Sequence, residues 1–183
     1  MFKSLNFTLR AFLLAGTCVC MPALPNVAHA QTSCECPPWV EASVKSDRMT
    51  ERAKRAPLAL VIQALAEEGL GPEWVYLMLE ESGGDPSARS SAGAGGLWQL
   101  MPATARHYGC EDRKDPVDAT HAAAKYIKKL MKDFKNDTFH VVMAYNMGGT
   151  NLRSNGPTEA ARSLAALVSC AFCLDPLTLK EKE

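Results

Sequence analysis

The sequence predicts a mainly α fold, organised as a small helical bundle. Apolar residues recur at helical spacing along most of the chain, and no stretch alternates apolar and polar residues long enough to indicate a sheet. Glycine and proline residues separate the periodic segments. The chain has 183 residues, 47% of them hydrophobic, which suffices for the core of one compact domain.

The N-terminal segment, residues 1–30, has the pattern of a cleavable signal peptide. Two basic residues precede an apolar run over residues 11–24, and a small-x-small cleavage signal ends at Ala30. The run is shorter than the about 20 apolar residues of a membrane span, which weakens the alternative of an uncleaved anchor. The residues before Cys18 form a poor lipobox, so lipid anchoring is a minor alternative. We expect an exported, periplasmic protein.

The segments that follow are delimited by helix start and stop signals. Residues 31–56 are rich in charge and lack clear periodicity, so we interpret them as an N-terminal extension. The first predicted helix covers residues 58–68, and nearby glycines end it. The second covers residues 74–82, because a proline suits its first turn and two glycines follow it. The third, residues 102–108, begins at a proline and stops at a glycine.

A long helix is expected from Pro116, because an apolar residue recurs every four positions on one face. Thr138 is expected to cap the next helix, which reaches Gly148. A final Ala-rich helix covers residues 157–171. The apolar stripe of the long helix comprises Ala122, Tyr126, Leu130 and Phe134. The expected organisation is a signal peptide, an extension, a central domain and a C-terminal helix with its tail, over residues 1–30, 31–56, 57–156 and 157–183.

A carboxylate beside a glycine-rich turn is the strongest local indication of chemistry. Glu81 stands near the end of the predicted helix over residues 74–82, just before Gly83 and Gly84. Partial cover by Trp and Met side chains would desolvate this Glu and raise its pKa towards the range of a general acid. From Glu80 and Glu81 alone, a solvated helix end is the more economical interpretation. The residues downstream reverse that preference.

Two motifs follow in order. Glu81-Ser82 precedes a turn of small residues and then GLWQLMP at residues 96–102, and a second block, AYNMG, occupies residues 144–148. Together they resemble the lytic transglycosylases of the soluble lytic transglycosylase (SLT) type. In that family the acid lies in a Glu-Ser pair before G-L-(M/W)-Q-x-M-P, and an Ala-Tyr-Asn-x-Gly segment lies across the cleft.

Two details narrow the resemblance. Trp98, in place of the commoner Met, and RKDPVDAT at residues 113–120 look most like the membrane-bound lytic murein transglycosylase D subgroup. The resemblance implies that residues 57–156 form a lysozyme-like catalytic SLT domain. The chain departs from the pattern at residues 83–86, GGDP, where many members carry an aromatic residue before Asn-Pro. Loss of that aromatic would change how a sugar packs there.

The resemblance also implies a reaction. The enzyme would cleave the β-1,4 bond between N-acetylmuramic acid and N-acetylglucosamine in peptidoglycan, with Glu81 acting first as acid and then as base. The substrate's N-acetyl group would stabilise the anomeric carbon, and the muramic acid 6-hydroxyl would replace water and give a 1,6-anhydromuramoyl end. Neither a metal nor a cofactor is implied.

The family also implies roles for residues that would contact the sugar or support the acid. Ser90 and Gln99 would hydrogen-bond the N-acetyl group or sugar hydroxyls, and Met101 would lie against a sugar face. Tyr145 would orient Glu81, and Asn146 would support that loop. Taken singly, these residues also fit structural roles, as a turn hydroxyl, a core filler or a buried aromatic.

Two other functions stay open. A goose-type lysozyme-like hydrolase would share the bundle but would need a second carboxylate for its water, and Asp85 is the only local candidate. Because Asp85 precedes a proline, a turn-forming role suits it better. A non-catalytic, cell-wall-binding component of an envelope machine is disfavoured by the intact Glu81, Gln99 and Tyr145. A looser hypothesis is that the enzyme opens the wall for a secretion, conjugation or pilus apparatus.

Charge does not indicate a nucleic-acid partner. Without residues 1–30 the chain has 18 basic and 20 acidic residues, a formal charge of −2 with neutral histidine. Lysines on the long helix follow helical spacing, which favours a solvated face, although such a face could also attract an anionic polymer such as peptidoglycan.

Five cysteines remain after residue 30, an odd number for a compartment that favours disulfides. We expect Cys34 and Cys36 to pair with Cys170 and Cys173, which leaves Cys110 as a free thiol. A zinc site with four thiolate ligands is the alternative, and a redox role for the C-terminal pair is weaker still.

Overall fold

The computed structural model describes residues 36–174, which belong to a single compact unit. The predicted signal peptide, Cys18 and Cys34 lie outside the described residues. The described part contains helices and isolated β-bridges but no strand, which confirms the mainly α prediction. In chain order the helices are α1 (Pro38–Val44), α2 (Asp47–Arg55), α3 (Leu58–Glu67), the 3-10 helix η1 (Pro72–Trp74), α4 (Val75–Ser82), α5 (Pro102–His107), α6 (Pro116–Asp133), α7 (Thr138–Met147), α8 (Gly149–Asn155) and α9 (Glu159–Leu174).

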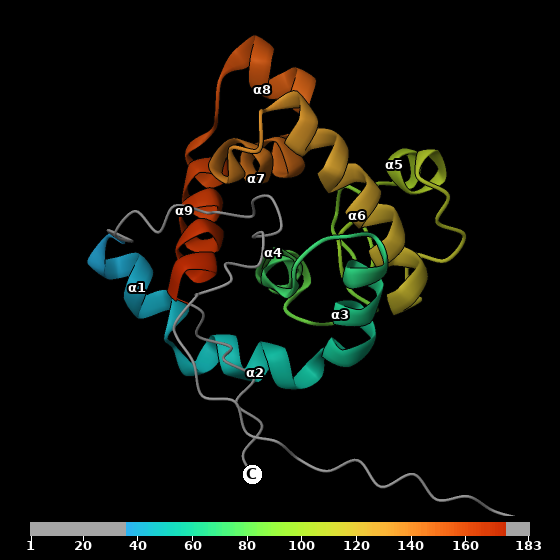
Figure 1. Ribbon diagram of the computed structural model, residues 1–183, viewed down its shortest axis with the longest axis horizontal. Coiled ribbons are helices and arrows are strands. Elements are labelled where there is room, and N and C mark those ends of the chain that lie inside the picture. The colour runs from blue at the N-terminus through green and yellow to red at the C-terminus, as the bar shows by residue number, and fades with distance from the viewer. Residues whose placement is uncertain (1–35, 175–183) are drawn as a thin grey trace, which may run out of the picture. The chain divides into compact units, whose positions relative to one another are not determined.

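Helix α4 lies at the centre of the bundle, as Figure 1 shows, with α2, α3, α6, α7 and α9 around it. It packs directly against α2, α3 and α9. Its first five residues, Val75 to Leu79, are all buried, so the helix exposes no apolar surface before its last turn. The core therefore fixes the position of the two glutamates that follow, Glu80 and Glu81.

The segment expected to be an aperiodic extension forms helices α1 and α2. Both are short, and they bury a few apolar side chains, chiefly Val40, Val44 and Met49. Helix α1 packs along α9, at the opposite end of the chain. These helices are thus part of the bundle.

The cysteine pairing agrees with the expected clamp. Cys36, just before α1, forms a disulfide with Cys170 in α9, with their Cα atoms 5.8 Å apart. Cys173 is also disulfide-bonded. Cys110 is free and buried, as expected. The disulfide joins α1 to α9 across 134 residues of sequence.

Several helix ends differ from the predicted ones. The expectation that Thr138 caps α7 is wrong: Thr138 is the first helical residue, and the carboxylate of Asp137 accepts a hydrogen bond from His140 N at 3.1 Å. Asp is as good an N-cap as Thr, and here it stands one residue earlier. Helix α8 was not predicted. It starts directly after Gly148, whose φ of +86° redirects the chain.

Among residues 36–174, no helix combines the length and apolar character that crossing a membrane requires.

Candidate active site

Glu81 lies in the last turn of α4, and the following residues end the helix there. The Ser82 hydroxyl donates to Met78 O at 3.1 Å and accepts from Gly84 N at 3.1 Å. Gly83 adopts a left-handed conformation, with φ +65°, and its N–H donates to Leu79 O. This is the usual glycine C-cap, which satisfies a terminal carbonyl. The cap turns the chain away from the helix at Gly83, two residues after Glu81.

The carboxyl group of Glu81 is desolvated. Burial raises its pKa to about 7, and the charge of Glu80 adds to the increase, whereas a hydrogen bond with the Asn146 side chain opposes it. Its Oε1 is buried and has no hydrogen-bond partner among the described residues. A buried carboxyl oxygen without a partner favours the protonated form. A substantial fraction of Glu81 therefore keeps its proton up to about pH 7, which suits a general acid.

The glycine-rich loop after α4 folds back on itself next to this turn. Isolated bridges pair Gly95 with Arg89 and with Leu100. The side-chain nitrogen of Gln99, Nε2, donates to Ala88 O at 3.2 Å and to Gly96 O at 2.9 Å. Gln99 itself has φ +44°, a backbone conformation uncommon for a residue with a side chain. Its side chain thus holds the loop with its N–H groups and keeps its Oε1 for another partner.

Trp98 fastens this loop to the bundle. Its side chain is fully buried, and its Nε1 donates to the Thr120 hydroxyl on α6 at 2.8 Å. The Tyr145 hydroxyl on α7 donates to Trp98 O at 2.8 Å. Burial raises the pKa of Tyr145, and the charge of Glu81 raises it further. The second motif therefore meets the first around Glu81.

The transglycosylase SLT domain family matches residues 60–167. The chain belongs to this family. The match covers Glu81, the glycine-rich loop and the Tyr145 segment, so the SLT resemblance found in the sequence is confirmed.

Individual SLT relatives align with this chain over 96 and 89 residues. Membrane-bound lytic murein transglycosylase D of Escherichia coli (strain K12) is 38% identical over 96 residues, which are 49% of this chain and 21% of the relative. A transglycosylase of enterobacteria phage PRD1 is 37% identical over 89 residues, 48% of this chain and 33% of the relative. The chain thus spans a fifth to a third of the length of these relatives.

A solved structure confirms the lysozyme-like SLT fold. An inactive mutant of lytic transglycosylase Slt from Pseudomonas aeruginosa superposes with a TM-score of 0.61, at 21% sequence identity. The likeness covers 70% of this chain and 25% of the other.

The remaining predicted site residues occupy accessible positions in the SLT domain. Met101 is 44% exposed, which leaves its side chain available to a sugar face. Ser90 is exposed, and its hydroxyl accepts from Ala94 N at 3.0 Å, so its proton stays available. Asn146 is exposed at the end of α7, and its side chain opposes the rise in the pKa of Glu81. Asp85 shapes the turn, as expected, by accepting from Ser87 N at 2.8 Å.

Arg113 is a residue that the sequence did not reveal as part of this site. Its guanidinium donates to Gly93 O at 2.9 Å and to Leu100 O at 2.8 Å, across the glycine-rich loop. Its own carbonyl oxygen occupies the space that a side chain at Gly96 would need. The only signal in the sequence was its place in the 113–120 segment, which indicated a subgroup and no role.

Within the described part of the chain, no group of three His, Cys, Asp or Glu side chains is placed to hold a metal ion.

Proposed function

We propose that this protein is a lytic transglycosylase that cleaves peptidoglycan, with Glu81 as its single acid and base. The observation that carries the proposal is a desolvated carboxyl with a pKa of about 7 at the position of the family's acid. Relatives that are named lytic murein transglycosylases support the substrate class.

The proposed reaction uses one carboxyl group twice, first as an acid and then as a base. Protonated Glu81 donates to the glycosidic oxygen as its bond to the anomeric carbon of N-acetylmuramic acid breaks, which releases the N-acetylglucosamine hydroxyl. The substrate's N-acetyl oxygen stabilises the electron-poor anomeric carbon. The Glu81 carboxylate then takes the proton of the muramic acid 6-hydroxyl as that oxygen bonds to the anomeric carbon. The product ends in 1,6-anhydromuramic acid, and Glu81 regains its proton.

The supporting residues follow from the hydrogen bonds in the loop. Gln99 offers only its Oε1 to the sugar, because its N–H groups bind backbone oxygens, so it accepts from an amide or hydroxyl. Ser90 donates its free hydroxyl proton, and Met101 lies along the sugar face. Tyr145 holds Trp98 O and acts on Glu81 through position, since its proton is already donated. Asn146 steadies the ionised form of Glu81 between the two steps.

Cellular placement is part of the proposal. We propose a periplasmic enzyme, exported by the signal peptide predicted over residues 1–30, that acts with an envelope-spanning secretion, conjugation or pilus apparatus. Cross-linked pull-down from cell envelopes should recover apparatus proteins together with the enzyme, and recovery of glycan alone would contradict the partner.

The chemistry is tested by mass spectrometry of fragments released from purified peptidoglycan. Anhydromuramoyl ends are expected. Reducing ends would instead indicate a goose-type hydrolase, in which water attacks. Glycan binding without any fragments would favour the non-catalytic wall-binding function.

The pH dependence of the reaction should report the Glu81 proton. Since kcat/KM follows the groups of the free enzyme, and the acid must be protonated, kcat/KM should fall as pH rises through about 7. Initial rates on a soluble glycan strand, measured from about pH 3 to about pH 9, check this. A decline already centred near pH 4.5, the ordinary value for Glu, would contradict the role of burial.

A further inference from the structure

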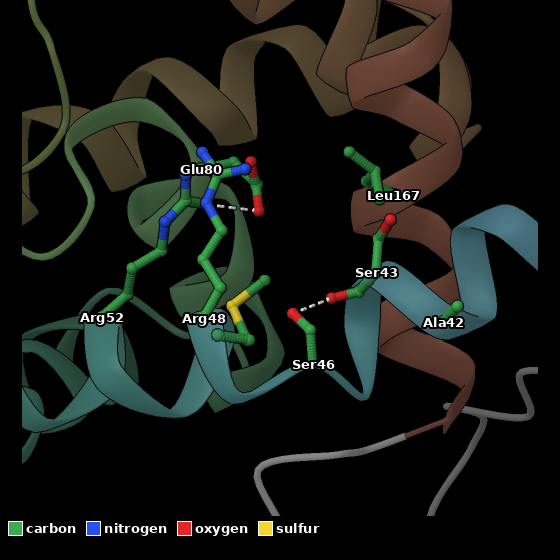
Figure 2. A pocket seen from close by; sticks show the side chains of 8 residues that line it. Ala42, Ser43, Ser46, Arg48, Arg52, Glu80 and Leu167 are labelled. Atoms are coloured by element: carbon green, nitrogen blue, oxygen red, sulfur yellow. Dashed lines mark hydrogen bonds and ion pairs between the residues drawn. The ribbon is translucent and has the colours of Figure 1, made fainter.

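Helix α2 lies outside residues 60–167, the part that matches the SLT family, yet it contacts the turn that carries Glu81. Arg52 on α2 forms an ion pair with Glu80, with Nη1 and Oε1 2.6 Å apart. Both side chains are largely shielded, with 10% and 17% of their surface exposed. Figure 2 shows the pair at a pocket that α1, α2, α4 and α9 line, with Arg48 beside it.

The backbone of Arg52 makes a second contact with the same turn. A Cβ atom at Gly84 would overlap the Arg52 carbonyl oxygen, so only glycine allows α2 to approach this closely. Arg52 therefore touches the chain one residue before Glu81 and three residues after it. Glu81 therefore lies between two residues, Glu80 and Gly84, that both contact Arg52 of α2.

Helix α2 is itself held in place from both sides. The Cys36–Cys170 disulfide ties the start of α1 to α9, and α1 packs against α2. Met49 and Ala53 of α2 are buried in the core. Arg52 therefore projects from a helix that the core and α1 hold in place.

We propose that Arg52 is a positioning residue for Glu81. Arg52 acts through its ion pair with Glu80, the residue before the acid. The proposal rests on the proposed function, in which Glu81 donates the proton. Misplacement of a catalytic group by about 1 Å can cost about 100-fold in rate. The orientation of the last turn of α4, which carries the Glu81 carboxyl, therefore affects kcat. Loss of the Arg52 charge would also leave the Glu80 carboxylate unbalanced beside Glu81.

The groups that face this pair and Glu81 define the variants needed. The ionisable ones are Glu80 on α4, Arg48 and Arg52 on α2, and Tyr145 on α7. Arg48 makes no ion pair with any described residue, which makes Arg48→Gln a matched control on the same helix and the same pocket.

Steady-state kinetics on soluble glycan strands test the proposal. Arg52→Gln should lower kcat about 10- to 100-fold while KM changes less than about 3-fold, because substrate contacts remain. Arg52→Lys should restore most of kcat, since it keeps the charge. Arg48→Gln should stay within about 2-fold of the unsubstituted protein.

A double-mutant cycle identifies the route through Glu80. If Arg52 acts through that carboxylate, Arg52→Gln combined with Glu80→Gln should have a kcat no lower than Arg52→Gln alone. Additive losses, or an unchanged kcat in folded Arg52→Gln, would overturn the proposal. If Arg52→Gln does not fold by circular dichroism, Glu80→Gln alone decides, because it breaks the same pair, and an unchanged kcat there refutes the role.

A failure of the proposed function can be distinguished from a failure of this inference. If the proposed function is wrong, the unsubstituted protein itself releases no anhydromuramoyl fragments. If only the role of Arg52 is wrong, the unsubstituted protein is active and folded Arg52→Gln has the same kcat.

Discussion

Glu81→Gln should lower kcat for the release of anhydromuramoyl fragments by at least about 100-fold and up to about 10⁴-fold. The amide has nearly the shape of the carboxyl but cannot donate the proton that the leaving oxygen needs. Mass spectrometry of digested peptidoglycan, combined with kcat on soluble strands, measures the effect. Activity close to that of the unsubstituted protein would remove Glu81 from the mechanism.

The matched control for this substitution is Asp85→Asn, the same change four residues along the chain. The Asp85 side chain is exposed and accepts from Ser87 N in the turn, so its loss should leave kcat nearly unchanged. A large loss at Asp85 with reducing ends as products would instead indicate a second carboxylate and a hydrolase.

The melting temperature of Glu81→Gln shows whether a loss of activity comes from the missing proton donor or from unfolding. The folded-state pKa of Glu81 is raised from 4.5 to about 7, so the folded protein binds more protons than the unfolded chain between these values. The contribution of Glu81 to stability is therefore full below pH 4.5 and is lost as pH rises through about 7. Glu81→Gln lacks this decline, so above pH 7 its melting temperature should at least equal that of the unsubstituted protein.

Gly96→Ala should prevent the glycine-rich loop from closing and cost more than about 4 kcal/mol of folding free energy. The new Cβ would overlap the Arg113 carbonyl oxygen, which is backbone and cannot rotate away. The residue also has φ +77°, which a side chain disfavours. For a domain of ordinary stability, about 5–15 kcal/mol, this loss is a large fraction of the free energy of unfolding and should lower the melting temperature strongly. Thermal unfolding followed by circular dichroism measures it.

Gly93→Ala provides the matched control in the same loop. Gly93 has φ +91°, but nothing lies within 4 Å of an added Cβ. Only backbone strain remains, worth about 1–2 kcal/mol. Equal effects at the two glycines would mean that conformation, and not the contact with Arg113, makes Gly96 necessary.

The long and punctuated helices could be predicted because their signals are local. The apolar stripe predicted for the α6 segment includes Ala122 and Leu130, which are buried, and Tyr126 and Phe134, which pack against the core; α6 itself ends one residue before Phe134. The short helices α1, α2 and α8, of 7, 9 and 7 residues, could not be predicted. Isolated helices of that length are unstable in water and depend on tertiary contacts.

The candidate site shows the same division. The residues around Glu81 indicated a possible acid, but only the family motifs downstream favoured that role, and the resemblance also supplied Gln99 and Tyr145. The partners of these side chains could not be predicted, because Tyr145 donates to a backbone oxygen 47 residues away and Gln99 donates to its own loop. Arg113 and Arg52 were missed for the same reason: their roles depend on backbone positions that only the folded chain brings together.

The burial of Cys110 has a consequence for the covalent integrity of the protein. Desolvation, together with the nearby Asp118 carboxylate, raises the pKa of this thiol to about 11. Thiol–disulfide exchange requires a thiolate, and at neutral pH almost none forms there. The odd cysteine is therefore a poor attacker of the Cys36–Cys170 bond. A chain that contains both an unpaired cysteine and disulfide-bonded ones is thereby protected against scrambling of its own cross-links.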